Sequence, residues 1–264
     1  MSSGAKMDLA IQGLRALVTA GAGGIGLEVA RAFVREGARV HVCDVDDSAL
    51  AALKTADPAL TWTKCDVADR SQVARLLDDA LAALGGLDCL VNNAGIAGPT
   101  GRVEEINPED WDRCLAVDLT GQFNCARLAI PHLKQSKNAS MMNVSSQAGE
   151  HGFPLRSPYA AAKWGVIGFT KTLAMELGPY GIRVNALLPG IVAGDRIRRV
   201  LEAKAQQRGV TFKEQEQFMF QFTSIKQYVT PQQLADMVVF TASPRAKTIS
   251  GQAISVCGDT NMLG

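Results

Sequence analysis

Hydrophobic and polar positions follow two different periods along this chain. Short, mainly apolar runs rich in strand-forming residues, such as 14–19 and 183–188, predict strands of which several are buried on both faces. Longer stretches with apolar residues three and four positions apart, such as 24–35, predict helices that pack by one face. On the same grounds we expect further strands at 39–43, 60–65, 87–91, 141–144 and 253–256. Further helices are expected at 71–84, at 158–177, after Pro231, and in a long segment that begins at Pro108.

The regular alternation of strands and helices predicts an α/β fold. Parallel strands joined by helical crossovers form a doubly wound sheet, here of about seven strands, with helices on both faces. No linker or charge block interrupts the pattern, so we expect a single domain over residues 1–264. The stretch 191–229 is long and leaves the end of a predicted strand, where open α/β sheets bind ligands. We interpret it as a substrate lid, and an ordinary pair of surface helices is the alternative.

Composition excludes several classes of partner. The net charge is +1, from 27 Lys and Arg against 26 Asp and Glu, so there is no electrostatic reason to expect nucleic acid or a membrane surface. No apolar run approaches the ~18 residues of a membrane span, and the first residues lack the apolar run of a signal peptide. Six cysteines without a C-x-x-C pair favour reduced thiols and a cytoplasmic location. With three histidines in no ligand spacing, we expect no metal.

A glycine-rich segment follows the first strand and opens the first helix. Glycine lets a phosphate approach the backbone, and the start of a helix offers free N–H groups and a partial positive charge. This context predicts the pyrophosphate site of a dinucleotide, with an ordinary tight turn as the alternative. The residues expected to contact the cofactor here are Thr19, Gly21, Gly23, Gly24, Ile25 and Gly26.

Asp44 indicates which dinucleotide this is. It stands at the end of the second predicted strand, eighteen residues after Gly26. A carboxylate at this place accepts hydrogen bonds from the adenosine ribose and repels a 2′-phosphate. No Lys or Arg lies within residues 20–27 or directly after Asp44. We therefore expect NAD as the cofactor rather than NADP, unless Asp44 is only a solvated residue at a strand end.

Tyr159 and Lys163 form a candidate acid–base pair. They are four residues apart, which places both on one face of a helix. A free tyrosine gives up its proton only near pH ~10, but a nearby ammonium and a cationic nicotinamide both favour the phenolate. By itself, the Y-x-x-x-K spacing is weak evidence for a catalytic pair, because chance matches are common. Three further motifs end predicted strands: Asn92-Asn93-Ala94-Gly95, Asn143-Val144-Ser145-Ser146 and Pro189-Gly190.

In this order, the motifs resemble those of the short-chain dehydrogenase/reductase family, from the loop at Thr19 to Gly251-Gln252. The resemblance implies a Rossmann-type fold in which Tyr159 is the general acid/base, Lys163 supports the phenolate and holds the nicotinamide ribose, and Ser146 polarises the substrate oxygen. It also implies a homo-oligomer, a tetramer or dimer, built on the helices after Pro108 and Pro158. The remaining implied cofactor contacts are Asp66 and Val67 at the adenine, Asn93, Ala94 and Gly95 at its ribose, and Pro189, Gly190 and Ile191 at the nicotinamide carboxamide.

Three positions depart from the family pattern. Ala20 replaces a glycine of the phosphate loop, and Gly194 stands where many members have a threonine that bonds the nicotinamide. Asp118 stands where the family usually has a catalytic asparagine that anchors a proton-relay water. A carboxylate cannot donate as an amide does, and its charge opposes that of Lys163. We therefore hypothesise an active enzyme whose pH–rate profile lies at higher pH; the alternative is that Asp118 marks a weakened catalyst.

The resemblance places three segments at the substrate: 95–101, 151–157 and the stretch 191–229. They contain the candidate substrate contacts His151, Arg156 and Arg196. Arginines near the reacting oxygen suit an anionic or polyhydroxylated small molecule. The alternative is that Arg156 pairs with a structural carboxylate such as Glu150 and that the arginines of the stretch form a solvated helix face.

The leading functional interpretation is an NAD-dependent dehydrogenase of a secondary alcohol or hemiacetal. A sugar, a polyol or a hydroxy acid is the favoured substrate class. A 3-oxoacyl thioester reductase is the alternative enzyme, although Asp44 favours NAD whereas biosynthetic reductases commonly use NADPH. A non-catalytic dinucleotide-binding regulatory protein is an alternative of another class, and the complete set of Ser146, Tyr159 and Lys163 argues against it.

Overall fold

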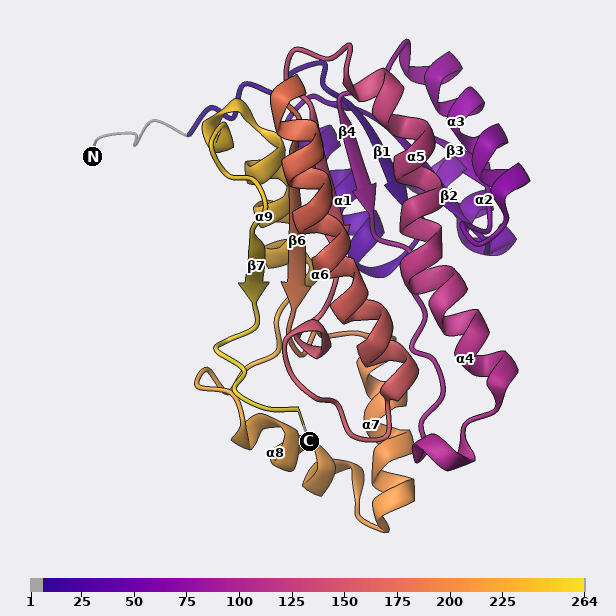
Figure 1. Ribbon diagram of the computed structural model, residues 1–264, viewed down its shortest axis with the longest axis vertical. Helices are drawn as coiled ribbons and strands as arrows, with labels where there is room; N and C mark the ends of the chain where they lie inside the picture. The colour runs from indigo at the N-terminus through magenta and orange to yellow at the C-terminus, as the bar shows by residue number, and fades with distance from the viewer. Residues whose placement is uncertain (1–6, 264) are drawn as a thin grey trace.

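A seven-stranded sheet runs through the centre of the molecule (Figure 1). The computed structural model describes residues 7–263, so residues 1–6 and 264 of the predicted domain lie outside it. All neighbouring strands are parallel, in the order β3-β2-β1-β4-β5-β6-β7. The strands are β1 Arg15–Thr19, β2 Arg39–Asp44, β3 Leu60–Lys64, β4 Cys89–Asn92, β5 Ser140–Val144, β6 Arg183–Pro189 and β7 Ala253–Val256. This confirms the predicted doubly wound fold.

Helices cover both faces of the sheet. One apolar core lies between the sheet and α1, α2 and α9, and a second lies between the sheet and α3, α5 and α6. Because both faces are covered, β5 and β6 are buried along their whole length. Within residues 7–263, none of the helices has the length and apolar character that a bilayer crossing requires. The α-helices are α1 Gly24–Arg35, α2 Asp47–Ala56, α3 Arg70–Leu84, α4 Pro108–Leu115, α5 Gly121–Leu133, α6 Ser157–Leu177, α7 Asp195–Arg208, α8 Phe212–Gln221 and α9 Pro231–Ala242.

The strand order places the ligand crevice. From β1 the chain builds outward to β2 and β3, and it then returns to build β4 to β7 on the other side. Because the connections after β1 and β4 diverge to opposite sides, a crevice opens at the carboxyl ends of these two strands. The glycine-rich loop follows β1, and the loop from Asn93 to Gly101 follows β4. The two predicted binding segments therefore flank one crevice.

Two elements differ from the sequence prediction. The helix α2 was not predicted, because only Leu50 and Leu53 in it are buried; its signal is Asp46, which accepts hydrogen bonds from the first free N–H groups of the helix. The long helix after Pro108 is present, but it is not a continuous α-helix. A π-helical segment, Ala116–Thr120, separates α4 from α5 and contains Asp118.

The stretch 191–229 forms the helices α7 and α8 beyond the strand ends, at the bottom of Figure 1. A bridge between Val192 and Val229 closes its base. Buried Leu201 and Met219 pack with Ile191 in a small apolar cluster of their own. The stretch is therefore a separately packed unit that borders the crevice, and its action as a lid stays a prediction.

Candidate active site

The loop between β1 and α1 presents bare backbone to the crevice. Gly21 and Gly26 are buried, and a Cβ on them would lie 2.6 Å from Val42 Cβ and 2.1 Å from the Ala20 carbonyl oxygen, respectively. Gly23 and Gly24 are exposed, and a Cβ on either would meet nothing within 4 Å. Gly23 caps α1 without a side-chain hydrogen bond, so the first N–H groups of the helix are left for a ligand. This arrangement fits a dinucleotide pyrophosphate.

Thr19 and Asn93 brace this loop against β4. The Thr19 hydroxyl is buried and accepts hydrogen bonds from the N–H groups of Asn93 and Ala94, both at 2.9 Å. The Asn93 side chain donates to the carbonyls of Thr19 at 3.0 Å and of Ala20 at 3.2 Å. These bonds join the ends of β1 and β4 and fix the conformation of the glycine-rich loop.

Asp44 and Asp66 stand at the ends of β2 and β3. Asp44 accepts a hydrogen bond at 3.2 Å from the N–H of Ala22, so it lies directly beside the glycine-rich loop, as a ribose-binding carboxylate must. Asp66 accepts from the N–H of Ala68 at 3.0 Å and forms an ion pair at 2.8 Å with Arg113 of α4. Arg113 was not singled out in the sequence, where nothing relates it to Asp66.

Lys163 and Asp118 meet in the interior. Lys163 is 3% exposed and Asp118 is fully buried, and the Lys163 Nζ lies 3.4 Å from the Asp118 Oδ2. Lys163 also donates to the Val144 carbonyl at 3.1 Å, and Asp118 accepts from the N–H of Ile96 at 2.7 Å. A Cβ on Gly95 would lie 3.3 Å from both charged groups, so they are packed against this loop. The π-helical segment thus places a carboxylate directly beside the lysine.

Tyr159 and Lys163 lie together on the first turns of α6, as their spacing predicts. The Lys163 Nζ is 5.5 Å from the centre of the Tyr159 ring. Ser146, half-buried at the end of β5, accepts a hydrogen bond from the N–H of Ala148 at 3.1 Å. Its neighbour Ser145 donates to the Lys163 carbonyl at 2.8 Å, which joins β5 to α6. This positioning role of Ser145 was missed, although the residue stands in the motif that identified Ser146.

Arg156 and Arg196 approach the same ring. Their guanidinium carbons lie 5.3 Å and 5.8 Å from the centre of the Tyr159 ring. Arg156 is 2% exposed; it donates to the Ala97 carbonyl, and burial lowers its pKa. Arg196 donates to the Gly95 carbonyl at 3.1 Å. Among the described residues, Arg156 forms no ion pair with Glu150 or another carboxylate, so this part of the alternative is wrong.

Lys204 is buried in α7, whereas the arginines of the same helix are exposed, as the alternative of a solvated face requires. Its Nζ lies 4.0 Å from the centre of the Phe153 ring. Burial, and to a smaller extent the charges of Arg156 and Arg208, lower the pKa of Lys204 to about 7. The signal was present in the sequence, because Leu201 and Ala205 share its helix face and are buried as well. His151, the third candidate substrate contact, is half-buried in the loop before α6.

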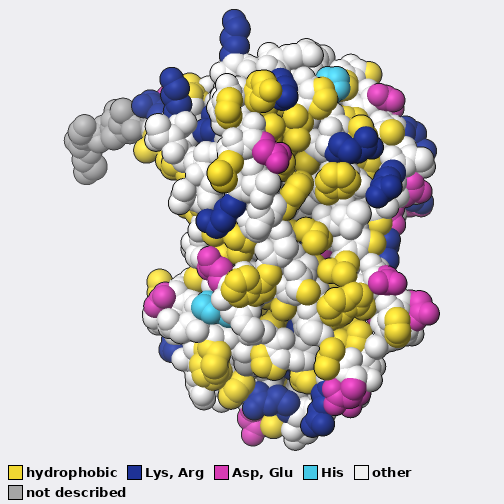
Figure 2. Space-filling model, viewed as in Figure 1, with side chains coloured by type: hydrophobic (Ala, Val, Ile, Leu, Met, Phe, Trp, Pro, Cys, Tyr) yellow, Lys and Arg dark blue, Asp and Glu magenta, His cyan; other side chains and the backbone are white. Residues whose placement is uncertain are grey.

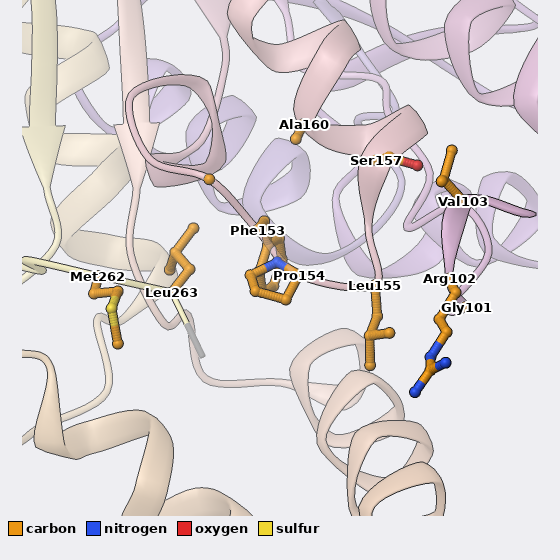
Figure 3. A pocket seen from close by; sticks show the side chains of 11 residues that line it. Gly101, Arg102, Val103, Phe153, Pro154, Leu155, Ser157, Ala160, Met262 and Leu263 are labelled. Carbon is orange, nitrogen blue, oxygen red and sulfur yellow. The ribbon is translucent and has the colours of Figure 1, made fainter.

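A cavity of about 770 Å³ adjoins this site (Figure 3). Phe153 and Leu155 line it from the loop before α6, and Leu263 lines it from the end of the chain. The ring of Phe153 also contacts the Tyr159 ring edge to face, with the centroids 6.5 Å apart. The mainly apolar cavity is therefore separated from Tyr159 by one aromatic side chain.

The end of β6 forms the remaining wall. Gly190 follows Pro189 and lies so close to Cys257 that a Cβ would be 2.6 Å from the Cys257 Cα. The Ile191 carbonyl accepts from the N–H of Val229 at 2.8 Å. Gly194 has a φ of +142°, which L side chains rarely adopt, so the local backbone explains why no threonine stands there. In residues 7–263, no three His, Cys, Asp or Glu side chains are grouped as metal ligands would be.

The order of motifs, and their meeting in one crevice, agree with comparisons to known proteins. Residues 20–259 match a family model described as enoyl-(acyl carrier protein) reductase. The chain belongs to the short-chain dehydrogenase/reductase family. The predicted resemblance is thereby confirmed. This dehydrogenase/reductase is an oxidoreductase that acts on CH–OH groups with a nicotinamide cofactor.

Three known proteins are similar to this dehydrogenase/reductase over nearly their whole length. A D-beta-hydroxybutyrate dehydrogenase of Cupriavidus necator is 33% identical, over 91% of this chain and 95% of its own. A 3-oxoacyl-(acyl-carrier-protein) reductase of Thermotoga maritima is also 33% identical, over 94% and 98%. The crystal structure of a variant of actinorhodin polyketide ketoreductase with NADPH is 34% identical, over 92% and 95%, with a TM-score of 0.87.

Proposed function

We propose that this protein is an NAD-dependent dehydrogenase of a secondary alcohol or hemiacetal, with a sugar, a polyol or a hydroxy acid as substrate. One observation carries the proposal. Lys163 is buried beside the Tyr159 ring and is held there by the Val144 carbonyl, at the end of the strand that carries Ser146. A buried ammonium so close to a tyrosine favours the phenolate, which is the base that alcohol oxidation needs.

The chain's own residues move the proton. The Tyr159 oxygen takes the proton of the substrate hydroxyl, and the Ser146 hydroxyl donates a hydrogen bond to the same substrate oxygen. As the oxygen loses its proton, a C=O bond forms and the carbinol C–H bond breaks with its electron pair. When bound, the nicotinamide supplies the acceptor for that hydride. Lys163 stabilises the phenolate, and Asp118 with Val144 holds Lys163 in place.

The proposed cofactor contacts follow the crevice from end to end. The bare backbone of Gly23 and Gly24 would hold the pyrophosphate, and Asp44 beside it would accept from the adenosine ribose. Asp44 supports NAD over NADP, because its charge repels a 2′-phosphate. The further contacts we propose are Thr19, Gly21, Ile25 and Gly26 in the loop, Asp66 and Val67 at the adenine, Asn93, Ala94 and Gly95 at the ribose, and Lys163, Tyr159, Pro189, Gly190 and Ile191 at the nicotinamide end.

The second candidate function is a 3-oxoacyl thioester reductase. The likeness to the Thermotoga maritima enzyme and to the ketoreductase with NADPH favours it. The carboxylate of Asp44 beside the glycine-rich loop opposes it, since this position disfavours the 2′-phosphate of NADPH.

The test is NADH formation from NAD with sugars, polyols, hydroxy acids and cyclic alcohols, with NADP and a 3-oxoacyl thioester with NADPH as further arms. We expect turnover of at least one alcohol with NAD. The Tyr159→Phe variant should lose activity by about 10²- to 10⁴-fold, because it removes the proton acceptor. Fluorescence titration with NADH shows whether the variant still binds the cofactor.

Tighter binding of NADPH than of NADH would make the interpretation of Asp44 wrong. Turnover confined to the thioester would establish the second candidate. Tight NADH binding without turnover in any arm would favour the non-catalytic binding protein.

We also propose a cytoplasmic homo-oligomer. The six free thiols support a reducing compartment. Figure 2 shows hydrophobic side chains gathered down the middle of the face formed by α5 and α6. Phe123 and Trp164 belong to these two helices and are 42% and 53% exposed. Large exposed aromatic side chains on neighbouring helices suit an interface between copies of the chain.

A further inference from the structure

Two arginines from distant segments converge on the reacting end of the crevice. Arg156 precedes α6 and Arg196 lies in the first turn of α7. They donate to carbonyls of one loop, at Ala97 and Gly95, and both lie within 6 Å of the centre of the Tyr159 ring. Nothing in the proton transfer described above uses either guanidinium.

Arg156 has far fewer hydrogen bonds than a buried structural arginine needs. Arg183 of this chain is also buried, and its Nη groups donate to four acceptors. Arg156 is more deeply buried, yet among residues 7–263 its guanidinium donates only to the Ala97 carbonyl. The Nε of each arginine has no partner, so the difference lies in the two Nη groups. Burial of a cation with so few acceptors is costly unless a ligand completes the set.

Positively charged side chains outnumber negatively charged ones around Tyr159. Lys163, Arg156 and Arg196 bring three positive groups to the ring. Among the Asp and Glu side chains of residues 7–263, only the charge of Asp118 acts on Arg156, besides the ionisable groups of Tyr159 and Cys114. Asp118 is already engaged by Lys163 and by the N–H of Ile96. The site therefore carries an excess of positive charge that suits an anionic ligand.

We propose that Arg156 and Arg196 together bind a carboxylate of the substrate, so that the alcohol oxidised here is a hydroxy acid. The proposal rests on the proposed dehydrogenase function and narrows its substrate class. Guanidinium groups bind carboxylates through paired N–H donors, and one such group on each side fixes the carboxylate plane. Because both guanidinium groups lie within 6 Å of the centre of the Tyr159 ring, the carboxylate lies only a few bonds from the carbinol carbon.

A different role for the arginines has a different kinetic signature. If they only supported the phenolate of Tyr159, their removal would lower kcat for every substrate, charged or neutral. If they bind a carboxylate, their removal raises KM for hydroxy acids and leaves neutral alcohols unchanged.

The experiment uses the full chain with NAD, a panel of hydroxy acids with the hydroxyl on the second, third or fourth carbon, and their methyl esters. Arg196→Gln is the main variant, because Arg196 is exposed and its loss should not affect folding. Arg198→Gln is the matched control, since Arg198 lies on the same helix and pairs with Glu202. Arg156→Gln is a second variant, used only if it binds NADH as the wild type does.

We expect the wild type to prefer the acids to their esters. Arg196→Gln should raise KM for the preferred acid by about 10- to 100-fold with kcat nearly unchanged, and Arg198→Gln should change neither. Calorimetric titration of the same acids into the NADH complex should show binding that Arg196→Gln weakens equally.

Three outcomes separate this proposal from the proposed function. Turnover of esters or sugars in preference to every acid overturns the carboxylate site and leaves the dehydrogenase standing. Equal loss of kcat for acids and esters in Arg196→Gln also overturns it. Acid binding to the NADH complex that depends on Arg196, without turnover, supports the carboxylate site and overturns the dehydrogenase.

Discussion

A carboxylate beside Lys163 changes the electrostatics of the tyrosine that the proposed reaction uses. Asp118 lies 3.4 Å from the lysine Nζ, and its second oxygen is held by the N–H of Ile96. The family usually places an amide here, which carries no charge and can donate to water. The negative charge offsets part of the positive field at Tyr159, whereas Arg156 and Arg196 add positive charge near the same ring.

Replacing Asp118 should therefore change the pH dependence of the enzyme. In Asp118→Asn the lysine charge is no longer offset, so the profile of kcat/KM should move to lower pH. The measurement is the pH–rate profile of both proteins with the same alcohol. Asp112→Asn removes an exposed carboxylate of α4 and serves as the control. An unchanged profile in Asp118→Asn would show that this carboxylate does not act on the tyrosine.

A buried histidine links the strands β2 and β3 at one edge of the sheet. His41 of β2 is 2% exposed, and its two ring nitrogens bond the hydroxyls of Thr61 and Thr63 on β3, at 2.8 Å and 3.1 Å. Burial lowers the pKa of His41 to about 4, although the charge of Asp79 opposes this shift. The strand pair that ends in Asp44 is thus most stable when this ring is neutral.

Protonation of His41 at acidic pH should lower the free energy of unfolding. The unfolded chain binds its proton near pH ~6.5, whereas the folded chain does so at about 4, so protonation in this window favours unfolding. The free energy of unfolding should fall by about 2–3 kcal/mol from this residue as the pH drops from ~6.5 to about 4. Urea unfolding of wild type and His41→Gln across this range measures the difference. His132→Gln should keep the wild-type slope; a wild-type slope in His41→Gln would contradict the prediction.

At the scale of the whole molecule, the face formed by α5 and α6 is the surface through which we expect two copies of the chain to associate (Figure 2). Met175, at 82% exposed, extends the apolar side chains of Phe123 and Trp164 along α6. Of these helices, α6 carries Tyr159 and Lys163, and α5 directly follows the π-helical segment that contains Asp118. Contact between two copies here would therefore lie against the elements that position the active site.

A charge on this face should separate the copies. We expect light scattering to give the wild type a mass that is a multiple of the 28.1 kDa chain. Trp164→Glu should shift the mass to that of one chain, because a carboxylate cannot be buried cheaply in an apolar interface. Trp62→Glu, at an exposed tryptophan on β3, is the control and should keep the wild-type mass. A wild type with the mass of a single chain would overturn the proposal of an oligomer.

The pattern of apolar positions and the order of the motifs determined the larger features. The strands lie within two residues of their predicted ends, because short, mainly apolar runs bounded by turn residues mark most of them. The spacing of Tyr159 and Lys163 placed them on one helix face, since four residues make about one helical turn. The helix α2 was missed because its short, alanine-rich sequence has only two buried leucines to mark a face.

Contacts between segments that are distant in the sequence are determined by the tertiary structure and could not be predicted from the sequence. No local sequence pattern predicts three of these features. They are the π-helical segment that brings Asp118 to Lys163, the burial of Arg156, and the pairing of Asp66 with Arg113. Local patterns report which face of an element is apolar. The partner of a buried charge is selected by packing among segments far apart in the chain, where the loss of hydration must be matched by a group that only the tertiary structure supplies.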